Sequence, residues 1–92
     1  MDKIEILNKK ETEGDWVFSV KIGEGESATT HAVFLQKEYW RKLTREKINP
    51  ESLIDKSFKF LLQRESKESI LRTFNLREIA NYFSEYEDII SS

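Results

Sequence analysis

The chain has 92 residues, of which 38% are hydrophobic, 12% aromatic and 35% charged. This composition predicts one small soluble domain over residues 1–92, since a chain of this length builds a single hydrophobic core. The lack of cysteine excludes a disulfide framework, a thiolate zinc site and a catalytic thiol. No apolar run reaches the roughly 20 residues of a membrane span. Because residues 1–5 also do not begin an apolar stretch of signal-peptide length, we expect a cytoplasmic protein that does not contact membranes.

Charge is unevenly distributed along the chain, although the net charge is only −2. Residues 1–35 hold seven acids and four bases, residues 36–77 hold six acids and eleven bases, and residues 78–92 hold four acids and no base. A basic middle between acidic ends indicates either a solvated surface with internal charge pairing or a binding face.

The first 36 residues show the period-two alternation of strands that bury one face. Three strands are predicted: one around residues 4–7, one over 16–22 and one over 29–35. Polar turns separate them, and the second turn contains two glycines. Because the links are short, the strands should pair as an antiparallel meander.

The spacing of apolar residues then changes to that of helices. A first helix is predicted over 37–45, with Tyr39, Trp40 and Leu43 on its buried face. A second begins at Asn49-Pro50, because Asn is a preferred N-cap and Pro suits the first helical position. Its apolar stripe includes Phe58.

Two further helices are expected towards the C-terminus. Ser66 can start a short helix that carries Ile70, Leu71 and Phe74. Asn75 and Glu78 form a capping-box pattern at the start of the last helix. Its expected buried face consists of Ile79, Tyr82, Phe83 and Tyr86.

These elements predict an α+β fold in which a three-stranded antiparallel β-meander (1–36) is followed by three or four helices (37–90) packed on one face. The helices must cover the apolar face of the sheet, since neither half is large enough to stand alone.

The clearest candidate binding segment lies over residues 37–47. It places five bases beside Tyr39 and Trp40; they are Lys37, Arg41, Lys42, Arg45 and Lys47. Such a segment suits an acidic protein surface or a nucleic-acid backbone with a stacked base. Alternatively, it is the solvated side of a helix whose aromatic residues are core.

The sequence offers little that predicts catalysis. His31 is the only histidine, and it shares a strand face with Val33 and Leu35, so we interpret it as a partly buried, hydrogen-bonded structural residue. The carboxylates, Glu65 and Glu85 among them, occur mostly where solvated helix surfaces or caps place them, and none has an isolated apolar setting that would raise its pKa towards a catalytic value. We therefore predict a non-catalytic protein without cofactor or metal.

The segments FKFLLQRE (58–65), SILRTF (69–74) and YFSEY (82–86) resemble a group of short uncharacterised prokaryotic proteins. The resemblance covers the second half of the chain. It implies a stand-alone cytoplasmic protein and assigns no activity or functional residue.

Taken together, these patterns predict an interaction domain that acts as a regulator or adaptor. Its partner would be another protein or a second copy of the chain, as in a homodimer. The alternative is a weak nucleic-acid-binding protein that uses the basic segment 37–47.

Overall fold

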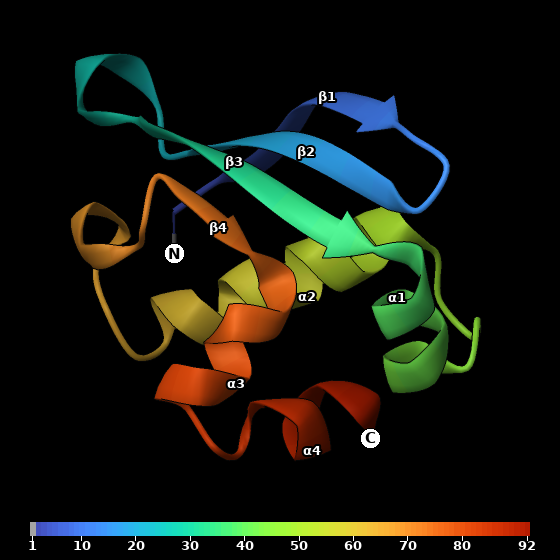
Figure 1. Cartoon of the computed structure of the whole chain (residues 1–92). Helices are drawn as coiled ribbons and strands as arrows, with labels where there is room; N and C mark the ends of the chain where they lie inside the picture. The colour runs from blue at the N-terminus through green and yellow to red at the C-terminus, as the bar shows by residue number, and fades with distance from the viewer. Residues whose placement is uncertain (1) are drawn as a thin grey trace.

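Three long strands form most of the sheet, as their alternating pattern predicts. The computed structural model describes residues 2–92. β1 (Ile4–Glu11), β2 (Asp15–Ile22) and β3 (Thr29–Gln36) pair antiparallel in chain order. Trp16, Phe18, Val20 and Ile22 of β2 are all buried, which confirms the predicted inner face. Figure 1 shows this sheet above the helices.

A fourth strand corrects the predicted three-stranded antiparallel sheet. β4 (Thr73–Asn75) pairs with β3 in parallel, so the sheet is mixed and has the order β1-β2-β3-β4. Parallel neighbours need a long crossover, and the helical segment between β3 and β4 provides it.

The helix expected from Ser66 is therefore wrong. Only the 3-10 turn η2 (Lys67–Ser69) forms there, and Phe74 pairs with Val33 of β3 instead. The spacing of Ile70, Leu71 and Phe74 fits a helix, but the free edge of β3 decides the outcome, since strand pairing is a tertiary effect that local spacing does not contain.

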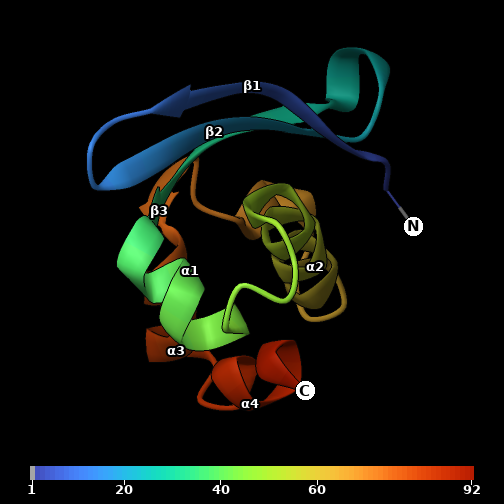
Figure 2. The ribbon, with the colours of Figure 1, turned by 90° about the vertical axis from the view of Figure 1, so that its right-hand side faces the viewer.

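Two helices lie directly against the sheet, and both begin where the sequence predicts. α1 (Lys37–Thr44) follows β3 without a break. α2 (Pro50–Leu62) has Asn49 as its N-cap, whose side-chain oxygen accepts a hydrogen bond of 2.7 Å from the Ser52 backbone N–H. Figure 2 shows α1 and α2 side by side beneath the sheet.

The last predicted helix is split into two short ones. The expected capping box is present at Asn75 and Glu78, where it opens the 3-10 turn η3 (Leu76–Glu78). α3 (Ile79–Tyr82) then ends at Phe83, whose backbone is extended, and α4 (Tyr86–Ser91) follows.

This break changes which aromatic residues are buried. Tyr82 was expected in the core, but it is 70% exposed, whereas Tyr86 is fully buried. The Tyr86 hydroxyl forms a hydrogen bond of 2.6 Å with the Ser57 hydroxyl of α2. A continuous helix through residue 83 would keep the chain in one direction, so the extended Phe83 allows α4 to pack beneath α1 and α2 (Figure 2).

The core joins the inner face of the sheet to the helices. Phe58 of α2 is fully buried, and its ring lies 5.7 Å from that of His31 and 6.1 Å from that of Phe74, measured between ring centroids. Phe83, which was expected on a buried face, is only half-buried, as is Leu62 at the end of α2. Among residues 2–92, no helix has the length and apolar character that crossing a membrane requires.

Candidate functional site

The predicted basic segment does not form one continuous basic face. Lys37 donates a hydrogen bond of 2.6 Å to Glu11 Oε2, and its side chain is only 17% exposed. This contact holds the pKa of Glu11 below its ordinary value. Arg41 pairs with Glu46 at 3.6 Å. Two of the five bases are thus engaged by acids of the same chain.

The other three bases gather at a hollow of about 460 Å³ between α1 and α4. Lys42, Arg45 and Lys47 are exposed there, and Glu87 and Asp88 of α4 belong to the same lining. The hollow therefore presents charges of both signs. It suits a partner of mixed charge better than a uniformly anionic one.

The loop that carries Arg45 and Lys47 has an unusual backbone. Arg45 and Glu46 both have positive φ, 54° and 62°, in the left-handed region that disfavours side chains. Thr44 supports the turn, because its hydroxyl donates to Trp40 O at 2.7 Å and accepts from the Glu46 N–H at 3.1 Å. These contacts fix the direction in which the loop leaves α1.

Tyr39 connects this hollow to the packed helices. The half-buried side chain donates a hydrogen bond of 2.8 Å from its hydroxyl to Glu87 Oε2. Burial is the main cause that raises the pKa of Tyr39, and the hydrogen bond to Glu87 raises it further. The phenol is therefore neutral at physiological pH and links α1 to α4.

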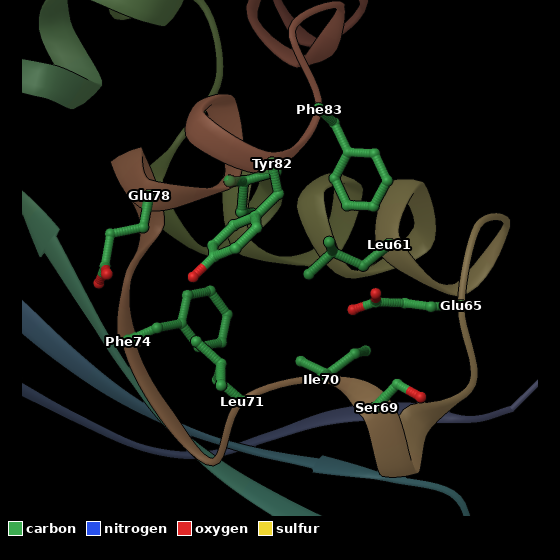
Figure 3. A pocket seen from close by; sticks show the side chains of 10 residues that line it. Leu61, Glu65, Ser69, Ile70, Leu71, Phe74, Glu78, Tyr82 and Phe83 are labelled. Carbon is green, nitrogen blue, oxygen red and sulfur yellow. The ribbon is translucent and has the colours of Figure 1, made fainter.

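A second pocket, which the sequence did not predict, is mainly apolar. It measures about 340 Å³ and lies between the end of α2, the segment from η2 to β4, and α3 (Figure 3). Its lining consists of Leu61, Glu65, Ser69, Ile70, Leu71, Phe74, Glu78, Ile79, Tyr82 and Phe83.

Two large side chains at this pocket are exposed. Leu71 is 50% and Tyr82 70% exposed, although both had been assigned to helix faces. They are accessible because residues 70–75 form no helix, with only the short strand β4 at residues 73–75, and because α3 stops at Tyr82. No local sequence signal indicates that stop, since neither proline nor glycine occurs near residue 83.

Glu65 is one of the two acidic residues that line the apolar pocket. Figure 3 shows its carboxylate pointing into the pocket, towards Leu61 and Ile70. Glu65 is half-buried, and burial raises its pKa above the ordinary value. Among residues 2–92 no side chain or backbone group pairs with this carboxylate.

His31 occupies the structural position that the sequence predicts. It is fully buried, with Nδ1 2.8 Å from Leu71 O and Nε2 2.8 Å from Thr29 Oγ1. Since a carbonyl only accepts, Nδ1 donates to Leu71 and Nε2 accepts from Thr29 in the neutral ring. His31 therefore ties β3 to the segment that forms one edge of the apolar pocket.

Within residues 2–92, no group of three or more histidine or acidic side chains is placed to hold a metal ion. Comparison of the chain with protein-family models, curated proteins and solved structures finds no match in any of the three. The candidate sites consequently rest on geometry and charge.

Proposed function

We propose that this domain is a non-catalytic protein-interaction module, acting as a regulator or adaptor, and that it holds its partner at the apolar pocket. The observation that supports this proposal is the pairing of a preformed apolar pocket with exposed Leu71 and Tyr82 beside it. Apolar patches of this kind are typical of interaction sites. Tyrosine is also enriched among the residues that dominate binding energy.

The hollow with Lys42, Arg45 and Lys47 has a secondary role in this proposal. Exposed charges contribute more to the rate and orientation of association than to affinity. We therefore assign these three bases to steering a partner, while Lys37 and Arg41 mainly pair with Glu11 and Glu46. The partner is a protein, either a different one or a second copy of this chain.

The alternative function is weak nucleic-acid binding by segment 37–47. The exposed Lys42, Arg45 and Lys47 favour it, whereas Glu87 and Asp88 in the same hollow oppose phosphate binding. Submicromolar, salt-sensitive binding of the purified chain to a generic oligonucleotide would favour this alternative over the proposed function.

Photo-crosslinking in the cells that produce the protein tests the proposal. The benzophenone amino acid p-benzoylphenylalanine replaces Tyr82 in one variant and Phe34 in a matched control. Phe34 is 38% exposed and lies on the sheet face that is directed away from the core. We expect a covalent protein adduct from the Tyr82 variant that survives nuclease treatment and is absent from the control.

Two results would count against the proposed function. One is the absence of any adduct at Tyr82. The other is an adduct that nuclease removes, since it would contain nucleic acid rather than protein.

A further inference from the structure

The charges that line the apolar pocket are all acidic. Its lining includes Glu65 and Glu78 but no lysine or arginine. One oxygen of Glu78 is already committed, because Oε2 accepts a 2.7 Å hydrogen bond from the Asn75 backbone N–H in the capping box. Figure 3 shows the Glu78 carboxylate directed away from the pocket, so Glu65 is the acidic lining residue whose carboxylate points into it.

Neighbouring bases are held away from Glu65. Arg64 donates to Phe60 O at 3.1 Å and contacts Glu85 at 3.4 Å, with its guanidinium carbon 3.6 Å from the centre of the Phe60 ring. Lys67 pairs with Glu68 at 3.0 Å. The carboxylate of Glu65 thus lacks a cationic partner within the described chain.

The environment of Glu65 determines which ligands suit the pocket. Glu65 is only half-buried, so its carboxylate has lost part of its hydration to the apolar side chains and keeps the rest, which a ligand covering it would remove at a cost. A purely apolar ligand would deepen that loss by excluding more water. An anionic ligand would add repulsion, whereas a cationic group would replace the water that it displaces with a charge-assisted hydrogen bond.

The size of the pocket limits the ligand further. A volume of about 340 Å³ lies at the lower end of the roughly 300–1,000 Å³ of ligand pockets. This space suits one large side chain with part of a second. Phe74, Tyr82 and Phe83 provide aromatic walls for such a side chain.

We infer that the pocket binds a partner segment in which a bulky apolar side chain and an arginine or lysine project to the same side. The apolar group fills the space between Leu61, Ile70 and Tyr82, and the cation reaches Glu65. This inference rests on the proposed function and specifies the partner's chemistry. In an extended segment the two side chains are two residues apart, because successive side chains alternate in direction.

Matched peptides test this inference on the full chain. The probes are the acetylated and amidated peptides Gly-Phe-Gly-Arg-Gly and Gly-Phe-Gly-Glu-Gly, together with Gly-Gly-Gly-Arg-Gly. Amide chemical shifts of the ¹⁵N-labelled protein report both the site and the affinity. We expect the Phe/Arg peptide to shift residues 65, 70–71 and 82–83, with an affinity at least about threefold above that of the Phe/Glu peptide.

The variant Glu65→Gln separates charge from packing. It keeps the size of the side chain and a hydrogen-bonding group, so the fold should be retained. We expect it to bind both phenylalanine peptides with similar affinities, while the wild-type preference for arginine shrinks at high salt.

Equal affinities of the wild type for the Phe/Arg and Phe/Glu peptides would overturn the cationic requirement. The absence of shifts at the pocket with every peptide would overturn the inference as a whole. The proposed function is judged separately by the Tyr82 adduct, so an adduct without peptide selectivity would retain the function and reject this partner chemistry.

Discussion

Phe58 is the residue whose burial most directly joins the two halves of the chain. Its ring packs between the histidine of β3 and the phenylalanine of β4. Phe58→Ala should therefore lower the free energy of unfolding by about 3–5 kcal/mol. Phe34→Ala is the matched control and should cost less than about 1 kcal/mol, since Phe34 lies on the exposed face. Denaturant unfolding of both variants measures the difference, and a similar small loss in each would contradict this core.

His31 should give the protein a specific pH dependence of stability. Burial lowers the pKa of His31 below its ordinary value of 6.5. The unfolded chain therefore takes up a proton at a higher pH than the folded one, so stability falls as the pH drops below 6.5. The loss levels off once the pH is below the folded pKa.

The comparison with His31→Gln isolates this contribution. Glutamine keeps one donor and one acceptor but does not titrate, so the variant should lack this part of the pH dependence. Unfolding free energies of both proteins at several pH values above and below 6.5 provide the measurement. Parallel curves for wild type and variant would show that His31 does not titrate differently on folding.

At the scale of elements, the turn after α1 stores backbone strain at Arg45. A left-handed conformation costs an ordinary L-residue about 1–2 kcal/mol, whereas glycine adopts it freely. Arg45→Gly should raise the free energy of unfolding by about 0.5–1 kcal/mol, after allowing for the greater entropy of glycine in the unfolded chain. Lys42→Gly is the control, since it lies within α1 and should lose about 1 kcal/mol. Destabilisation by both changes would contradict the strained turn.

The elements that the sequence predicts correctly are those with local signals. The alternation in β2 and β3 and the caps at Asn49 and Asn75 all depend on neighbouring residues. β4 is different, because three residues become a strand only when β3 offers an unpaired edge. The end of α3 at Tyr82 is likewise set by packing. The residues after it form α4, whose Tyr86 makes a buried hydrogen bond to Ser57 of α2, a contact between elements far apart in sequence.

The candidate sites follow the same division. Proximity in sequence indicated the basic segment, and Glu46, which pairs with Arg41, lies within it. The other acids come from distant elements, since Glu11, which pairs with Lys37, belongs to β1, and the acids that line the hollow belong to α4. The apolar pocket combines Leu61, Leu71 and Tyr82 from three segments. Its existence depends on the parallel strand and on the helix break, so local periodicity could not reveal it.

At the scale of the whole molecule, the proposed function gives the two candidate surfaces different roles in binding a partner. The apolar pocket removes nonpolar surface from water and can contribute most of the affinity. The mixed-charge hollow between α1 and α4 mainly affects encounter rate and orientation. If this division is correct, uncharged polar substitutions at the apolar pocket abolish retention of the partner, whereas uncharged substitutions of the bases at the mixed-charge hollow leave retention largely intact.

A nuclease-treated pull-down with three forms of the full chain tests this central claim most directly. The forms are the wild type, a pocket variant with Leu71→Ser and Tyr82→Ser, and a basic variant with Lys42→Gln, Arg45→Gln and Lys47→Gln. All five positions are exposed, so unfolding curves should confirm that each form is folded. We expect the wild type and the basic variant to retain the same protein partner and the pocket variant to lose it. Retention by the pocket variant together with loss by the basic variant would contradict the account.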